Sequence, residues 1–395
     1  MRLQFLSLIL ISLFGTAASA DPAQFEQCKA RLQAQASEHG ISAATHNEVI
    51  PKLEYQARVI ELDRSQPEFT QSFSDYFAKR VSQSRIEKGR DLYTQYSEFL
   101  AELTRTYGVP GQYLVSFWGL ETNFGSYLGG MPTLDSLATL ACDPRRSEFF
   151  TTEFLLALEL LEREDLLAED MKGSWAGAVG HTQFMPSNYL RYAIDGDNDG
   201  RIDLWGSRRD ALASAANFLS QLGWQRQQRW GREVKLPEDY DFSQALIQRP
   251  LQDWRSLGLR KADGGPLPVV AGMDAQLIIP SGHKGPVFLV YDNFDVIMQW
   301  NRSTSYALSV GHLADRIAGA GPLKQSIPND EVRLHRTDVI QMQELLIEKG
   351  FDPGVPDGLL GPSTRSALRE FQISAGLIGD GFPDRKTLAQ LGLDY

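Results

Sequence analysis

The sequence contains few of the residues that bind transition metals. It has two cysteines and six histidines among 395 residues, and neither a CxxC nor an HxxxH spacing occurs. Such a set does not favour a zinc site. Low-complexity tracts are also missing, and the hydrophobic and charged fractions, 42% and 23%, are typical of a folded globular protein.

No long hydrophobic run follows residue 20, so the sequence predicts no transmembrane anchor there. The N-terminus differs, because Arg2 precedes a mostly apolar segment over residues 3–14 and small residues stand at positions 18–20. This pattern predicts a secretory signal peptide over residues 1–20. No cysteine stands at the cleavage site to carry a lipid, so we expect an exported protein without an anchor.

Basic residues are outnumbered, with 39 Lys and Arg against 50 Asp and Glu and a net charge of −11. The field of such a chain repels phosphate groups, so we expect no nucleic-acid partner. Both cysteines, Cys28 and Cys142, belong to the exported part. An oxidising compartment would allow a disulfide that closes a long loop, worth about 4 kcal/mol if unstrained. The alternative is a pair of buried free thiols.

The most informative stretch is 109–125, which reads VPGQYLVSFWGLETNFG. Proline near its start and Gly125 at its end predict one helix, with the glycine as C-cap. Leu114, Trp118 and Glu121 fall at i, i+4 and i+7, on one otherwise apolar stripe. Burial disfavours a charged carboxylate, so we expect a raised pKa for Glu121 and a role as general acid. The alternative is a glutamate at a helix end, bonded to backbone or paired with an arginine.

Helical spacing dominates the chain, and strand-like patterns are confined to residues from 231 to about 300. The expected helical segments are Phe25–His39, segments around Leu53–Arg64 and Tyr76–Tyr107, and then Thr133–Cys142, Glu148–Glu162, Asp210–Leu222 and Tyr306–Ile317. Ala275–Ile279 and Pro286–Tyr291 predict a β-hairpin. Residues 331–395 predict three short helices without an ionisable cluster, which indicates a binding module.

Two loops carry candidate ligand-binding groups. Arg145 and Arg146 are either an exposed solubilising pair or a clamp for a carboxylate or sugar oxygen. Gln183, Phe184 and Met185 precede Pro186. A polar amide among apolar side chains indicates a wall facing carbohydrate, although plain loop packing is equally consistent.

An aspartate-rich loop follows, with oxygen side chains at Asp195, Asp197 and Asp199 and a glycine after the last of them. Positions 1, 3, 5 and 6 of an EF-hand loop have this pattern, and position 7, here Arg201, supplies a backbone carbonyl. Position 12 is a glycine in this chain, so a lengthened loop closed by Asp210 is needed. We predict structural calcium, with a metal-free turn as the alternative. A calcium sensor is not favoured, because there is a single loop.

Several segments resemble the B-type soluble lytic murein transglycosylases, which cleave the glycan strands of peptidoglycan. The matching segments are Val59–Pro67 (VIELDRSQP), Tyr107–Gly125 (with WGLETNFG), Leu137–Phe150 (with DPRR), Gly180–Tyr192 (GHTQFMPSNYLRY) and Asn301–Tyr306 (NRSTSY). In the tail, GPSTRSALREFQ and its neighbours resemble a three-helix peptidoglycan-binding domain.

This resemblance implies a mainly α (α+β) protein with a lysozyme-like helical catalytic core. The expected organisation is a signal peptide at 1–20, a catalytic region at 21–320 with a β-rich insertion at about 231–300, a linker at 321–334 and a peptidoglycan-binding domain at 335–395. The implied partners are peptidoglycan strands, with cell-wall enzyme complexes as further candidates. The implied location is the periplasm.

The resemblance also implies roles for individual residues, with Glu121 as the single catalytic acid/base and no cofactor in catalysis. The implied sugar-binding residues are Arg145, Arg146, Ser174, Gln183, Phe184, Asn301 and Tyr306. The implied calcium ligands are Asp195, Asp197, Asp199, Arg201 and Asp210. The chain departs from some members by carrying Trp300 and Phe218 where those have tyrosine, and by one extra residue before the closing aspartate.

A single carboxylate fits a substrate-assisted reaction better than the paired carboxylates of ordinary glycosidases. The expected activity is therefore cleavage between N-acetylmuramic acid and N-acetylglucosamine that leaves a 1,6-anhydro end. The alternatives are a lysozyme-type hydrolase, with a second carboxylate brought in by the fold, and a non-catalytic wall-binding scaffold.

Overall fold

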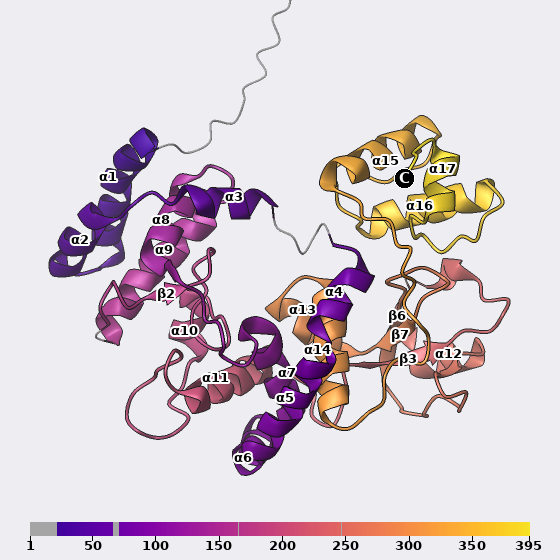
Figure 1. The fold of residues 1–395 in the computed structure, drawn as a ribbon, viewed down its shortest axis with the longest axis horizontal. Helices are drawn as coiled ribbons and strands as arrows, with labels where there is room; N and C mark the ends of the chain where they lie inside the picture. The colour runs from indigo at the N-terminus through magenta and orange to yellow at the C-terminus, as the bar shows by residue number, and fades with distance from the viewer. Residues whose placement is uncertain (1–21, 66–70, 165, 246) are drawn as a thin grey trace, which may run out of the picture. The chain divides into compact units, whose positions relative to one another are not determined.

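The computed structural model describes residues 22–65, 71–164, 166–245 and 247–395. The fold is mostly helical with small antiparallel sheets, as the sequence predicts (Figure 1). The predicted signal peptide lies outside the described residues. Among the helices that are described, none combines the length and the apolar character that crossing a membrane requires.

The described residues form two compact units. The first combines the segment up to residue 64 with residues 130–178 and 185–187, and the second contains the rest. Helix α8 packs against α9 and α1 in the first unit, and a disulfide joins Cys28 to Cys142 with their Cα atoms 5.9 Å apart. The elements of this unit are α1 (Pro22–His39), α2 (Ala43–Val49), the 3-10 helix η1 (Ile50–Lys52), α3 (Ala57–Ser65), β1 (Met131–Pro132), α8 (Thr133–Cys142), α9 (Ser147–Arg163) and β2 (Lys172–Gly173).

The second unit carries the remaining helices of the catalytic region. These are α4 (Phe73–Arg80), α5 (Gln83–Gln95), α6 (Ser97–Tyr107), α7 (Gly111–Thr122), α10 (Pro186–Tyr192, which begins in the first unit), α11 (Arg208–Gln221), α13 (Asp292–Trp300) and α14 (Thr304–Ile317). The segment predicted as helical around 76–107 is divided between α4, α5 and α6. The side chain of Ser82 accepts a hydrogen bond from the Arg85 amide and starts a new helix there.

Helix α7 is the buried centre of this unit and packs chiefly against α14. The hydroxyl of Ser116 donates to the carbonyl of Val310 on α14 at 2.7 Å. The predicted C-cap is wrong, because the helix ends at Thr122 and Asn123 takes the left-handed cap conformation. Gly125 is still required, since a Cβ there would come within 2.2 Å of the His181 ring.

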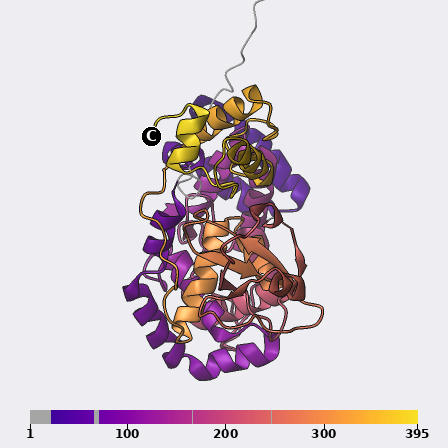
Figure 2. The same cartoon turned by 90° about the vertical axis from the view of Figure 1, so that its right-hand side faces the viewer.

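A five-stranded antiparallel sheet with the order β4-β6-β7-β3-β5 follows α11. The predicted hairpin is confirmed, with Gln276 opposite Val290. One face of the sheet joins the core around α7 and α14 through Phe288 of β7, and Trp230, directly before β3, belongs to the same core. Figure 2 shows the fold turned by 90° from Figure 1. The strands and short helices are β3 (Gly231–Lys235), the 3-10 helix η3 (Phe242–Gln244), β4 (Arg249–Pro250), α12 (Leu251–Ser256), β5 (Arg260–Lys261), β6 (Asp274–Ile278) and β7 (Val287–Val290).

The strand-rich region ends earlier than predicted, because residues 292–300 form helix α13. Its buried residues, Asn293, Phe294, Val296 and Ile297, are spaced for one face of a helix.

The tail forms the three predicted helices, α15 (Arg336–Glu348), α16 (Pro362–Ser374) and α17 (Arg385–Leu391). They enclose an apolar core of their own that includes Met342, Leu368 and Leu388. Two buried glutamines fasten the turns between the helices: Gln343 accepts from the Gly358 amide at 2.9 Å, and Gln372 accepts from the Gly381 amide at 2.8 Å.

Candidate active site

Glu121 lies on the last turn of α7, where the helix places it beyond the buried side chains of Leu114 and Trp118. Its carboxyl accepts two hydrogen bonds at the same oxygen, Oε1. The indole Nε1 of Trp300 donates to it at 2.9 Å, and the hydroxyl of Tyr306 is the second donor. In the described part of the chain, Oε2 receives no hydrogen bond. The residue is partly accessible to solvent, so this second oxygen can meet a ligand.

The pKa of Glu121 is raised to about 7. Burial is the largest cause, because a charged carboxylate loses hydration there. The hydrogen bonds from Tyr306 and Trp300 and the positive charge of Arg80 act in the opposite direction, since they stabilise the charged form. The direction agrees with the sequence prediction. A carboxyl group with this pKa is partly protonated at neutral pH and can both give and take a proton.

Tyr306 remains protonated throughout this range. Its pKa is raised well above 10 by burial and by the neighbouring charge of Glu121. A hydroxyl that does not ionise is a permanent donor to Glu121. It therefore stabilises the Glu121 carboxylate, and it can equally donate to the neutral acid when the proton is on Oε2.

Trp300 reaches the carboxyl from an aromatic cluster. Its ring lies 4.4 Å from that of Phe117, 5.5 Å from that of Phe184 and 5.2 Å from that of Phe218, between centroids. These rings hold the indole in position beside Glu121. The departure noted at Trp300 thus has a definite consequence: an indole N–H replaces the tyrosine of some relatives and donates directly to the acid.

Two predicted sugar-binding residues, Phe184 and Gln183, make contacts within the fold. The ring of Phe184 is 1% exposed and packs edge-on against Phe218, so it supports the cluster and offers no face to a ligand, contrary to the expectation. The amide of Gln183 donates to the carbonyls of Leu128 and Gly180, both at 3.0 Å. This matches the alternative of loop packing for that amide nitrogen.

Asn301 lies at the C-terminal end of α13, directly after Trp300, and is partly exposed. The residues that sequence reasoning missed are Trp300 as a donor and Arg80, whose charge reaches Glu121 from α4. The position of Trp300 before the NRSTSY segment could have indicated the first. No local pattern indicates Arg80, because its charge comes near Glu121 only in the folded chain.

His181 supports α7 from the same unit. The indole of Trp118 donates to its Nδ1 at 3.1 Å, so the proton of the neutral ring is on Nε2. Burial, assisted by the charge of Arg208, lowers the pKa of His181 to about 4. This histidine is therefore a neutral packing group at physiological pH.

The first unit contains the other predicted contacts. Arg145 donates to the buried Asp63 carboxylate at 2.8 Å, and Arg146 donates to its other oxygen. The pair is thus not simply a solubilising one, because it holds its loop onto α3, while each side chain stays about 40% exposed. The hydroxyl of Ser174 accepts from the Ala178 amide at 3.1 Å and stabilises a turn.

The aspartate-rich loop brings three carboxylates together. Oxygens of Asp195, Asp197 and Asp210 lie within 4.8 Å of one another. Asp199 is outside this group, and its carboxylate accepts from the Arg201 amide at 2.9 Å. A cluster of carboxylate oxygens is the donor set that Ca²⁺ prefers, so three of the predicted side chains fit a calcium ion.

The fold and the site define a class of protein: a mostly helical protein with one carboxyl group that can give and take a proton near neutral pH. Comparison with known families agrees. The model of the transglycosylase SLT domain matches residues 24–315, and the chain belongs to this family. A second model, the putative peptidoglycan binding domain, matches residues 335–391.

Individual relatives show the same likeness. SltB3 of Pseudomonas aeruginosa, solved with NAG-NAM-pentapeptide, is 42% identical, with a TM-score of 0.89 over 93% of this chain and 99% of that one. Slt35 of Escherichia coli, solved with calcium, is 27% identical, with a TM-score of 0.65 over 76% of this chain and 94% of that one. Membrane-bound lytic murein transglycosylase B of Escherichia coli (strain K12) is 33% identical over 260 residues, which span 62% of this chain and 66% of the relative.

Proposed function

We propose that this chain is a lytic transglycosylase of peptidoglycan, with Glu121 as its acid and base. The observation that carries the proposal is the carboxyl group with a pKa of about 7 whose Oε1 accepts from both Tyr306 and Trp300. With Oε1 occupied as an acceptor, the proton of the neutral acid sits on Oε2. That oxygen is the one available to a substrate.

The reaction begins when Glu121 gives this proton to the oxygen that links N-acetylmuramic acid to N-acetylglucosamine. The bond from that oxygen to C1 breaks, and the muramic 2-acetamido oxygen stabilises the positive charge at C1. The Glu121 carboxylate is held by its two donors, which favour the charged form. It then takes the proton of the C6 hydroxyl while that oxygen bonds to C1. The product is a 1,6-anhydro end, and Glu121 is protonated again.

A single carboxylate suffices for this sequence, because the nucleophile belongs to the substrate and is held in position by it. Asp135, the nearest acidic residue after Glu121 in the sequence, accepts from the Glu54 amide at 3.0 Å in the first unit. Glu102, on α6, is exposed. The groups that shift the pKa of Glu121 are two hydrogen-bond donors and the cation Arg80, and none of them is a second carboxylate.

Product analysis on purified sacculi tests the proposal. Mass spectrometry of the released fragments should find anhydro ends, each one water lighter than a reducing end. Reducing ends alone would establish a lysozyme-type hydrolase. Glu121→Gln should lower turnover by about 10²- to 10⁴-fold, the usual contribution of general acid–base catalysis. A variant as active as the wild type would remove Glu121 from its role, and an inactive wild type that still binds sacculi would establish a scaffold.

We further propose that the 335–395 module holds the enzyme on its insoluble polymer. The relative named above, SltB3, was solved with a peptidoglycan fragment, and the binding-domain match supports the same kind of ligand here. Arg145, Arg146, Ser174, Gln183 and Asn301 stay candidate sugar contacts. Deleting residues 331–395 should weaken binding to sacculi more than turnover of short soluble fragments. Equal loss on both would contradict this role.

We also propose a structural Ca²⁺ held by Asp195, Asp197 and Asp210, supported by the calcium in Slt35 and by the donor set. The ion would tie the loop to α11, where Asp210 lies.

For the N-terminus we propose a cleaved signal peptide, a periplasmic location and access to cell-wall enzyme complexes. Sequencing the N-terminus of the exported protein tests the cleavage.

A further inference from the structure

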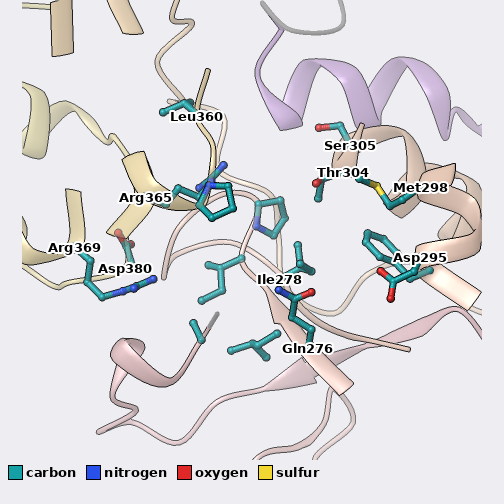
Figure 3. A pocket seen from close by; sticks show the side chains of 16 residues that line it. Gln276, Ile278, Asp295, Met298, Thr304, Ser305, Leu360, Arg365, Arg369 and Asp380 are labelled. Atoms are coloured by element: carbon teal, nitrogen blue, oxygen red, sulfur yellow. The ribbon is translucent and has the colours of Figure 1, made fainter. Parts of the chain in front are cut away.

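A cavity of about 350 Å³ lies between the sheet of the catalytic region and the C-terminal helices, all within the second unit (Figure 3). This volume is in the range of small-ligand sites. Strand β6 provides an apolar floor with Leu277 and Ile278. Helix α16 contributes Arg365 and Arg369 on one side. The cavity is separate from the Glu121 site, since neither Glu121 nor its two donors line it.

Neither arginine has a counterion in contact, and Arg369 is buried while Arg365 is half-buried. Arg369 is 7% exposed, and its Nε is buried without a hydrogen-bond partner. Neither guanidinium forms a hydrogen bond or an ion pair with any described residue. Burial lowers the pKa of both groups. A buried charge left unpaired is costly, so an anion from outside would relieve a real penalty.

Asp380 lies beside the arginines but is already engaged. One of its oxygens accepts from the amide of His283 at 2.9 Å and contacts the ring of the same residue. The other accepts from Gln372 at 3.0 Å and from the Phe382 amide at 2.9 Å. Its charge attracts the guanidinium groups from a distance, but its acceptor positions are taken.

The opposite side of the cavity is polar and carries a negative charge. Asp295 of α13 and Thr304 and Ser305 at the start of α14 face the arginines across the floor (Figure 3). Asp295 is exposed and, within the described chain, has no ion pair or hydrogen bond. The space therefore presents cations at one end, an acid at the other and apolar side chains between them.

On the basis of the proposed function, we propose that this cavity binds the carboxylate end of a peptidoglycan stem peptide, with Arg365 and Arg369 as its anion-binding groups. A guanidinium offers a planar fork of N–H donors that matches a carboxylate. In a strand that carries peptides, the lactyl carboxyl of the sugar is consumed in an amide bond, so the free carboxylates belong to the peptide. Asp295 is placed to accept from an N–H or ammonium group further along the same peptide.

The test uses the full-length Glu121→Gln protein and isothermal titration with the free pentapeptide, which carries no sugar. The matched probe is the same peptide with its terminal carboxyl amidated. Loss of charge-assisted hydrogen bonds should weaken binding roughly 10- to 100-fold. Equal binding of the two peptides, or no binding of the free acid at millimolar concentration, would overturn the proposal.

Two variants locate the binding. Arg369→Gln should weaken binding of the free acid to the level of the amide, and so should Arg365→Gln, whose half-buried side chain is easier to replace without loss of fold. The control is Lys349→Gln, which removes the same charge from an exposed position of the same module. An equal loss in the control would contradict a specific site. Cleavage of peptide-free glycan by the wild-type enzyme tests the proposed function separately, so either idea can fail alone.

Discussion

Replacing Glu121 by glutamine should stabilise the folded protein, by an amount that grows with pH. Glutamine has nearly the same shape, and its carbonyl oxygen can accept from Trp300 and Tyr306, but it carries no charge to desolvate. In the wild type, folding raises the pKa of this carboxyl from 4.5 to about 7. The folded protein therefore binds more protons than the unfolded chain between these values, so stability falls as pH rises through this window.

The magnitude follows from 1.36 kcal/mol for each unit of pKa difference. Above the folded pKa, at about pH 8.5, the ionised Glu121 should cost the wild type about 3 kcal/mol relative to the variant. At about pH 5, where the folded-state carboxyl is neutral, the cost should be about 1 kcal/mol. The variant's advantage should thus grow by about 2 kcal/mol across this range.

Denaturant unfolding followed by tryptophan fluorescence, at several pH values, measures this difference. Glu102→Gln is the matched control, because it makes the same change on the exposed face of α6. Its effect should stay within about 0.5 kcal/mol at every pH. The reasoning would be refuted by a Glu121→Gln advantage that does not change with pH, since the carboxyl would then titrate alike in the folded and unfolded states.

Other perturbations test the neighbouring claims. Trp300→Phe removes one donor to the Glu121 carboxylate, so the pKa of Glu121 should rise and the alkaline limb of the pH–rate profile should move to higher pH. The value of kcat/KM should fall about tenfold. An unchanged profile would contradict a direct hydrogen bond from Trp300. Chelation of calcium should lower the Tm of the wild type, and Asp197→Asn should abolish that response. A wild type whose Tm does not change on chelation would refute the calcium site. Loss of the Cys28–Cys142 disulfide, by reduction or by replacement of both cysteines with serine, should lower the free energy of unfolding by about 4 kcal/mol. Denaturant unfolding with and without reductant measures this difference. Equal stability of the oxidised and reduced forms would show that the disulfide does not stabilise the fold.

Local patterns were sufficient for much of the fold. The helical spacing of 133–142 predicts α8 with its observed bounds, because apolar side chains recur at the period of a helix. Alternating runs predict the β6–β7 pairing, since a short loop leaves neighbouring strands few other partners. Spacing did not show where the helical segment around 76–107 divides, for example at Ser82, which caps the start of α5.

The candidate catalytic residue could be found from the sequence, because a glutamate on an otherwise apolar helical stripe is unusual and the stripe spans only a few residues. Its environment could not. The donors to Glu121 come from 179 and 185 residues further along the chain, and Phe184 turned out to support the aromatic cluster from inside. The unpaired state of Arg365 and Arg369 is likewise a property of the packed tail and sheet.

The sequence by itself thus determined most of the helical segments, the β-hairpin and which carboxyl group is out of place. Only the tertiary structure decided which oxygen of that group is held, how far its pKa moves and which cations are left without a counterion. The reason is that periodicity acts between residues a few positions apart, whereas desolvation and hydrogen bonding depend on every group that the folded chain brings within a few ångströms.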